Sequence, residues 1–179
     1  MTPVTAENAI LVGTYDGFTW IRCEGKGSFL TSPALKEYAE SRIAAGERCL
    51  VIDLAACTGM DSTFMGTLAG LSARLSAPGG KVQVAEAGER NRRSLEDLGL
   101  DFLLEIDPPV APWRGKVDEI RASLSPLQAP GLPGQLDRAK HVLEAHKVLS
   151  SASGENAKKF AGVVSLLEAE VASKRSEEG

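Results

Sequence analysis

The stretch CLVIDLA, residues 49–55, limits the fold more than any other part of the chain. It is an apolar run interrupted only by Asp53. A strand that is apolar on both faces is typical of the centre of a sheet with helices on its two sides. A helical pattern precedes this run in residues 31–46. Another follows it, with Phe64, Leu68, Leu71 and Leu75 at i, i+4, i+7 and i+11. The run therefore predicts a central strand in an α/β fold.

The flanking patterns extend this fold in both directions. Residues 9–25 hold two β-prone runs around Asp16-Gly17, which suits a type I′ turn, so they predict a hairpin. Ser32 is the expected N-cap of the first helix, with Pro33 at its first helical position. The stretch KVQVAEA alternates like a strand, GERNRRSLEDLGL is typical of a third helix, and DFLLEID is a candidate last strand. The order β-β-α-β-α-β-α-(β) predicts a mixed α/β sheet with right-handed parallel crossovers.

The last third of the chain has a different character. Residues 108–133 hold most of the nine prolines and predict a linker or a wrapped segment, with a helical turn near 117–124 and Trp113 as a docking residue. Two amphipathic helices should follow Gly134. Their apolar stripes are Leu136, Ala139, Val142, Leu143 and Leu149, then Phe160, Val163, Val164, Leu167 and Val171. Such a pair should pack on the domain or on another chain. We expect a domain at 1–107, a Pro-rich linker at 108–133 and a C-terminal helical extension at 134–179.

Composition and charge exclude several classes of protein. Hydrophobic residues make up 43% of the chain, enough for a core, and the net charge of -4 argues against nucleic acid or an anionic membrane as partner. The sequence shows no long uncharged apolar stretch and no signal-peptide pattern. Three cysteines without CxxC spacing predict reduced, buried thiols in a cytoplasm. His141 and His146 have no acidic or thiol cluster beside them in the sequence, so we expect no metal site and no cofactor.

Known catalytic motifs do not fit the chain. Asp53 at a strand end invites comparison with a response-regulator receiver, but the other strands lack its acidic pair and lysine, so Asp53 should accept backbone hydrogen bonds. The stretch GMDSTFMG does not match G-x-S-x-G, and no histidine precedes His141 to serve as a base. No phosphate-binding G-x-x-x-x-G-K-[ST] loop occurs, and ERNRR is typical of a solvated helix face. We therefore expect no enzyme; a small enzyme or ligand-binding protein is the alternative.

GMDSTFMG, residues 59–66, joins the central strand to the following helix. A Ser or Asp before an apolar helix is usually an N-cap that accepts a free backbone N–H. The stretch also carries a resemblance. An apolar strand ends in Asp-Leu, an Asp-Ser-Thr junction opens a helix, and a Gly-Gly turn, a strand and a helix ending in "GL" follow. In this order and spacing, residues 9–107 resemble the STAS domain of bacterial anti-sigma-factor antagonists.

The resemblance implies a regulatory protein-binding module with a phosphorylatable serine at Ser62, and Thr63 as second choice. In this family the unphosphorylated form binds an anti-sigma factor that is also a serine kinase, phosphorylation ends binding, and a phosphatase resets the cycle. The resemblance also implies a partner-binding face, made of Ser28, Thr31, Ser32, Asp61, Ser62, Thr63 and Phe64. A phosphate suits a helix N-terminus, yet it adds about -1.5 to -2 charges beside Asp61.

One departure from the family pattern leaves two interpretations open. The family usually has glycine directly after the second hydroxyl, where this chain has Phe64 and places its glycine at Gly66. Either Ser62 is a phosphorylation switch, or the chain is a divergent STAS scaffold or small-ligand-binding module without phosphorylation. Phe64 is either a core residue or an exposed anchor for a partner. The C-terminal helices either cover the site or join two copies of the chain.

Overall fold

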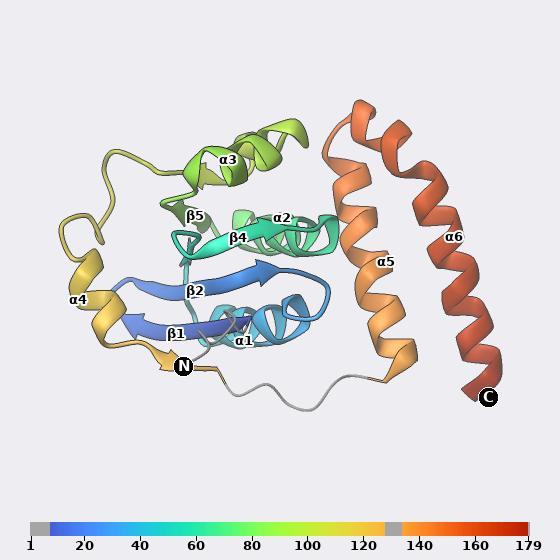
Figure 1. Cartoon of the computed structure of the whole chain (residues 1–179), viewed down its shortest axis with the longest axis horizontal. Helices are drawn as coiled ribbons and strands as arrows, with labels where there is room; N and C mark the ends of the chain where they lie inside the picture. The colour runs from blue at the N-terminus through green and yellow to red at the C-terminus, as the bar shows by residue number, and fades with distance from the viewer. Residues whose placement is uncertain (1–7, 128–133, 179) are drawn as a thin grey trace, which may run out of the picture.

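The computed structural model describes residues 8–127 and 134–178 of the chain. Its centre is a seven-stranded mixed sheet (Figure 1). The strands are β1 (Ala9–Tyr15), β2 (Phe18–Gly27), β3 (Cys49–Asp53), β4 (Cys57–Met60), β5 (Lys81–Ala85), β6 (Glu105–Ile106) and β7 (Ser125–Pro126). Their order is β6-β5-β3-β2-β1-β7, and β4 pairs with the far end of β2. β1 is antiparallel to β2 and β7, and the other pairs are parallel. The mixed sheet expected from the sequence is confirmed.

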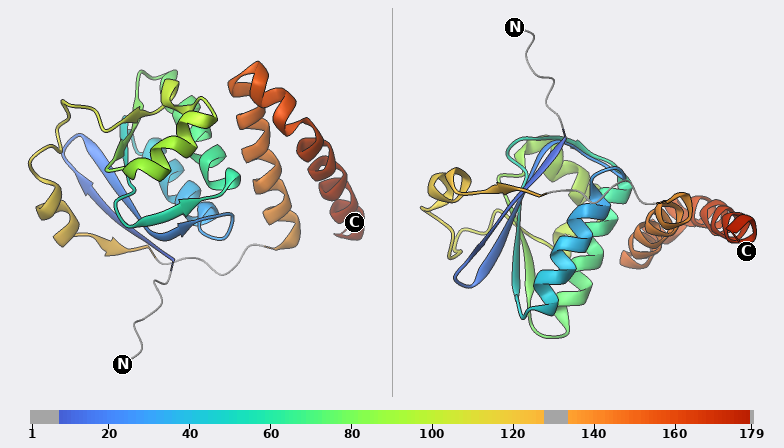
Figure 2. Two further views of the ribbon diagram at one scale, coloured as in Figure 1. Left: turned by 45° about the horizontal axis from the view of Figure 1, so that its top comes forward. Right: turned by 90° about the horizontal axis from the view of Figure 1, so that it is seen from below.

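The helices surround this sheet and extend beyond it (Figure 2). They are α1 (Ser32–Ala44), α2 (Ser62–Ser76), α3 (Gly88–Asp97), the 3-10 turn η1 (Leu100–Phe102), α4 (Val117–Ala122), α5 (Gln135–Ala152) and α6 (Gly154–Glu178). α1 and α2 lie side by side on one face of the sheet, and α4 lies at the opposite end of the molecule from α5 and α6. No helix in the described ranges is both long and apolar enough to cross a membrane.

The central strand has the double burial that its sequence predicts. Every residue of β3 is buried. Leu50 and Ile52 join the larger core beneath α1, α2 and α3, whereas Cys49 and Val51 join a second cluster on the other face. Alternation along a strand sends successive side chains to opposite faces, which explains the uninterrupted apolar run. All three cysteines are free and buried, as expected.

Two local expectations needed correction. Ser32 is not the N-cap of α1; Thr31 holds that position and Ser32 is the first helical residue. The reason is a tight turn before the helix, in which the Thr31 hydroxyl accepts the N–H of Ser28 and the Ser32 N–H donates to the Ser28 carbonyl. The short strand β4 was not expected, since its sequence, CTGM, has no β-type alternation. It forms because β2 continues past β3 and offers free backbone groups at Gly25–Gly27.

Residues 108–126, here called the strap, run across the second face of the sheet. Trp113 is fully buried; its Nε1 donates to Gln83 Oε1 at 2.7 Å and its ring meets Trp20 edge to face at 5.5 Å. β7 then pairs with β1. The strap is thus held by a buried aromatic contact at one end and by strand pairing at the other.

Asp53 anchors the strap in the middle. Arg121 of α4 donates from Nε to Asp53 Oδ2 at 2.9 Å and from a terminal nitrogen to Oδ1 at 3.1 Å. The carboxylate is fully buried and also accepts from Arg22, from Trp20 Nε1 and from the N–H of Ala55. The expected backbone hydrogen bond of Asp53 is therefore confirmed, but two arginines that the sequence analysis did not assign neutralise its charge.

The expected C-terminal helical pair is confirmed, and it packs on the domain of its own chain. α5 lies against α2, and α6 folds back along α5 (Figure 1); residues 135–178 are here called the hairpin. α5 buries Ala139, Ala145, His146 and Leu149. α6 buries Phe160 and Val171, whereas Val163 of the expected stripe is 40% exposed. Part of the second stripe therefore faces solvent.

Candidate functional site

Asp61 organises the junction between β4 and α2. As the N-cap of α2 it accepts the N–H of Phe64 on Oδ1 at 2.8 Å, as expected for an acid in this position. Its Oδ2 accepts the N–H of Phe29 at 2.8 Å, and its own N–H donates to the carbonyl of Gly27. One carboxylate thus holds the start of α2 and the loop before α1 in a fixed relation.

The seven residues expected on the partner face do lie together at the N-terminal ends of α1 and α2. They differ in exposure. Ser28, Ser32, Thr63 and Phe64 are buried, whereas Thr31, Asp61 and Ser62 are half-buried. Two neighbours outside that set, Phe29 and Leu30, are 44% and 51% exposed. Exposed apolar side chains in a loop are a common feature of binding surfaces, and both residues lie in the stretch GSFLTS, residues 27–32, which leads into α1.

Phe64 is a core residue in this structure. Its ring is fully buried and lies so close to β2 that a Cβ on Gly27 would be 2.9 Å from it. Gly27 therefore makes the room that Phe64 needs. The phenylalanine that replaces the family's glycine is therefore buried in the core, and its ring packs against β2 beneath the start of α2.

Ser62 is bound by a residue from the far end of the chain. Its Oγ lies 2.7 Å from Nε2 of His146 on α5. The other ring nitrogen, Nδ1, lies 2.7 Å from the carbonyl of Val142, which can only accept, so Nδ1 donates. In the neutral ring Nε2 is then an acceptor, and the Ser62 hydroxyl donates to it. The His146 ring also meets Phe160 of α6 edge to face.

A second histidine of α5 makes the matching contact to α1. Nε2 of His141 lies 2.7 Å from Oγ of Ser32, and Thr67 Oγ1 is 3.5 Å away. Burial lowers the pKa of His141 to about 4, helped by the nearby charge of Lys36. Ser32 and Ser62 are the first residues of α1 and α2. The two histidines therefore hold the same position of two neighbouring helices.

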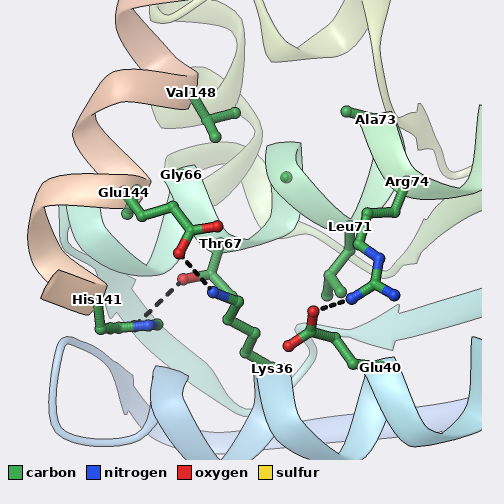
Figure 3. A pocket seen from close by; sticks show the side chains of 12 residues that line it. Lys36, Glu40, Gly66, Thr67, Leu71, Ala73, Arg74, His141, Glu144 and Val148 are labelled. Atoms are coloured by element: carbon green, nitrogen blue, oxygen red, sulfur yellow. Dashed lines mark hydrogen bonds and ion pairs between the residues drawn. The ribbon is translucent and has the colours of Figure 1, made fainter. Parts of the chain in front are cut away.

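A cavity beside these contacts is lined by residues of α1, α2 and α5 (Figure 3). Gly66, Gly70, Leu71 and Val148 form its apolar part. Two ion pairs lie at its rim: Lys36 Nζ with Glu144 Oε2 at 2.9 Å, and Arg74 with Glu40. His141 and Thr67 line it, whereas Ser62 and His146 do not.

The pairing of Ser62 with His146 was not expected, because the two residues lie 84 positions apart in the chain and meet only through tertiary packing. A serine nucleophile needs a histidine whose second nitrogen is oriented by a further group, an oxyanion site and room for substrate. Here Nδ1 of His146 donates to the Val142 carbonyl of its own helix, and neither Ser62 nor His146 lines the cavity. The geometry describes a contact between helices. In the described ranges no cluster of three or more His, Cys, Asp or Glu side chains is placed to hold a metal ion.

A STAS-domain family profile matches residues 9–112, more than half of the chain. The chain belongs to the STAS domain family. Its fold is similar to an anti-sigma factor antagonist from Mycobacterium paratuberculosis, with 26% identity and a TM-score of 0.51 over 64% of this chain and 95% of that one. No curated protein matches the STAS chain by sequence.

Two further solved structures share the STAS fold at lower identity. Unphosphorylated SpoIIAA, an anti-sigma factor antagonist from Bacillus, is 17% identical, with a TM-score of 0.50 over 63% of this chain and 98% of that one. A putative anti-sigma factor antagonist from Thermotoga maritima is 16% identical, with a TM-score of 0.52 over 62% of this chain and 92% of that one. The family match ends at residue 112, so α4 and the hairpin lie beyond it.

Proposed function

We propose that this chain is a bacterial, cytoplasmic regulator that binds an anti-sigma factor through the N-terminal ends of α1 and α2, without being an enzyme. The observation that carries the proposal is the position of Ser62. It is the first residue of α2, directly after the N-cap Asp61, in a STAS domain whose solved neighbours include anti-sigma factor antagonists. Asp61 also fixes the loop with exposed Phe29 and Leu30 beside it.

Phosphorylation of Ser62 by a serine kinase that is also the anti-sigma factor is the proposed switch, with a phosphatase to reverse it. Ser62 is half-buried, whereas Thr63 is only 4% exposed, so Ser62 is the more accessible of the two hydroxyls. A phosphate there meets the positive end of the α2 dipole, which is electrostatically favourable. It also adds about two negative charges beside Asp61, which an acidic or closely packed partner surface does not tolerate.

The second candidate is a STAS module that binds its partner or a small ligand without phosphorylation. The specific observation in its favour is that Ser62 is hydrogen-bonded to His146 and covered by α5. The cavity between α1, α2 and α5 is the place for a small ligand in that case. The two candidates share one fold and one face, and they differ in whether Ser62 is ever modified.

Mass spectrometry of the protein isolated from its native cells separates the candidates. We expect one phosphate on the peptide that contains Ser62, and its loss in a Ser62→Ala strain but not in a Thr63→Ala strain. Co-purification should yield an anti-sigma factor with an ATP-binding kinase fold, bound more weakly by Ser62→Asp than by Ser62→Ala. Phosphate on Thr63 alone, or on neither residue under any growth condition, contradicts the switch.

A further inference from the structure

We propose that the α1–α2 face is a helix-binding groove, that α5 fills it as a displaceable internal ligand, and that a partner reaches Ser62 by inserting a helix of similar chemistry in place of α5. The proposal rests on the proposed function only for the partner's identity. The groove and its occupant are argued from the contacts of α5.

The groove is shaped for the close approach of a helix backbone. A Cβ on Gly66 would lie 2.3 Å from the carbonyl oxygen of Ala145 and 2.9 Å from its Cβ. Contacts this short are excluded for a real side chain, so α2 needs glycine here and α5 needs a small residue opposite. Gly70, one turn later, leaves ordinary van der Waals space toward Val148. The glycine that in this chain comes two residues later than in the family pattern is the crossing point of the two helices.

Polar side chains fix α5 in the groove at both ends of the crossing. His141 binds Ser32 of α1 and His146 binds Ser62 of α2, each at 2.7 Å. Glu144, between them, pairs with Lys36 at 2.9 Å (Figure 3). At the start of α6, Asn156 donates to the carbonyl of Leu98. The hairpin is therefore aligned by hydrogen bonds and an ion pair as much as by apolar contact.

The balance of these contacts makes α5 displaceable. The apolar side chains that α5 buries are two alanines and one leucine, Ala139, Ala145 and Leu149. Leu149, together with Phe160 of α6, belongs to the larger core, so the apolar contact of the hairpin is concentrated near the turn between α5 and α6. Along the rest of α5, Ala139 and Ala145 bury little apolar area and contribute little to holding the helix in place. The polar groups of the interface can all bind water once α5 leaves, since serine, lysine and histidine side chains are readily solvated. An incoming helix replaces each of these contacts by an equivalent one.

The groove also defines the chemistry of the partner helix. Facing Gly66 it needs a small residue, as Ala145 is. The preceding residue should be acidic, as Glu144 is for Lys36, and the next should bind a serine hydroxyl, as His146 does. An apolar residue four positions after the small one takes the place of Leu149. The predicted partner segment is thus an amphipathic helix with the pattern acid, small, hydrogen-bonding, x, x, apolar.

The presence of α5 in the groove also controls modification of Ser62. A hydroxyl that donates to a buried imidazole at 2.7 Å has no room for a phosphoryl group between the two atoms. α5 must move before a kinase can act, and a phosphate on Ser62 then prevents α5 from returning to the same position. Displacement of α5 therefore precedes both partner binding and phosphorylation.

The test uses the full chain with Ala145→Leu, which places a larger side chain against Gly66 and leaves the groove itself unchanged. The matched control is Ala161→Leu, on the exposed side of α6. The probe is a fluorescent synthetic peptide of residues 134–153, measured by anisotropy. We expect it to bind Ala145→Leu about tenfold more tightly than wild type or the control, a difference of about 1.4 kcal/mol. Amide hydrogen exchange in residues 61–67 should become faster in Ala145→Leu only.

Fluorescence of Trp20 and Trp113, which lie in the cluster on the other face of the sheet, reports whether the variant domain is folded. If Ala145→Leu fails to fold, His141→Ala/His146→Ala replaces it, because this variant removes both histidine contacts without added bulk. The proposal is overturned if neither variant exposes residues 61–67, or if an opened variant binds the peptide no better than wild type. Absence of a phosphate on Ser62 in cells would contradict the phosphorylation switch without affecting peptide binding by the opened variants. Failure of the proposed function and failure of α5 displacement are therefore distinguishable.

Discussion

The strap and the hairpin are two additions to one sheet, and they are attached in opposite ways. The strap enters the second core with a fully buried tryptophan, and its Arg121 makes a bidentate ion pair with a fully buried carboxylate. The hairpin lies at the other end of the molecule (Figure 1). It meets the domain through two apolar side chains of the larger core, Leu149 and Phe160, and otherwise through alanines, two histidines and an exposed ion pair.

The difference predicts that the two additions separate from the sheet under different conditions. Removing the strap leaves a buried charge and a buried aromatic pocket without partners, and both are strongly unfavourable. Removing the hairpin takes Leu149 and Phe160 from one edge of the larger core, but the polar groups that it leaves behind are hydroxyls and a lysine, which water can solvate. The domain should therefore unfold together with its strap, whereas the hairpin should open without global unfolding.

The largest effect is expected at the strap. Trp113→Ala should lower the free energy of unfolding by about 3–5 kcal/mol, because it empties a core position and leaves Gln83 without its indole donor. Thermal and urea unfolding measure it, with one transition for sheet and strap. Phe102→Ala, at a side chain that is 89% exposed, is the control and should change stability by less than about 0.5 kcal/mol. A Trp113→Ala protein as stable as wild type would show that the strap is not part of the core.

The next effect is expected where the hairpin crosses α2. Gly66→Ala should weaken docking of α5 by about 1–3 kcal/mol, since the added methyl group overlaps the Ala145 carbonyl. Gly70→Ala should instead stabilise α2 by up to about 1 kcal/mol, because its Cβ meets only ordinary contact at 3.7 Å. Hydrogen exchange of α5 and α2 measures both. Equal behaviour of the two variants would contradict the close crossing.

The two attachments should also differ in their dependence on pH. Burial and Lys36 lower the pKa of His141 from 6.5 to about 4, against weaker opposing effects of Glu144 and Asp61. Docking of α5 should thus be strongest above pH 6.5 and weaken as pH falls toward 4. Burial alone would raise the pKa of Asp53. Hydrogen bonds from Arg121 and Ala55 outweigh this effect, so the pKa is lowered from its ordinary value of 3.8. The strap contribution is then complete above pH 3.8 and is lost only in stronger acid.

Hydrogen exchange measured from pH 7 to pH 4, corrected for the intrinsic rate, tests this order. Protection of α5 should fall across that range while protection of β3 stays high. His141→Gln, which keeps a hydrogen-bonding group without a charge change, should show a weaker pH dependence of α5. Release of strap and hairpin at the same pH would remove the distinction between them.

The smallest effect is expected at the ion pair between Lys36 and Glu144, whose side chains are 26% and 64% exposed. A double-mutant cycle with alanine at both positions should give a coupling of about 0.2–1 kcal/mol that decreases in salt. A larger, salt-independent coupling would mean that this ion pair, rather than the Gly66 crossing, holds the hairpin.

The sequence predicted the parts of the fold that are recorded in local patterns. The run at residues 49–55, the hairpin around Asp16-Gly17 and the helix beginning at Ser62 have their expected structures. The hairpin turn is not the expected type I′, because Gly17 has a positive φ of 90° and Asp16 does not. β4 and β7 were missed because each is short and forms only where a neighbouring strand offers free hydrogen-bonding groups. Such pairing depends on tertiary structure and leaves no periodicity in the sequence.

The site was predicted on one side only. The position of Asp61 and Ser62 at a helix start followed from the motif, but the contacts from His141 and His146 depend on a packing 84 residues or more away in the chain. A signal did exist: His146 interrupts the apolar stripe of its helix between Val142 and Leu149. A polar residue within a buried stripe needs a hydrogen-bond partner, and the hydroxyl of Ser62 is that partner.

Both outer strands of the sheet are only two residues long, β6 on one side and β7 on the other. Pro126 of β7 also has no N–H to donate. Short edges of this kind give another copy of the protein few backbone groups to pair with. Behind β7 lies β1, the seven-residue stretch AILVGTY, which is long, apolar and uncharged. β7 pairs with Leu11 and Val12 in the middle of β1, so the strap occupies the most apolar part of an edge that another chain could otherwise extend.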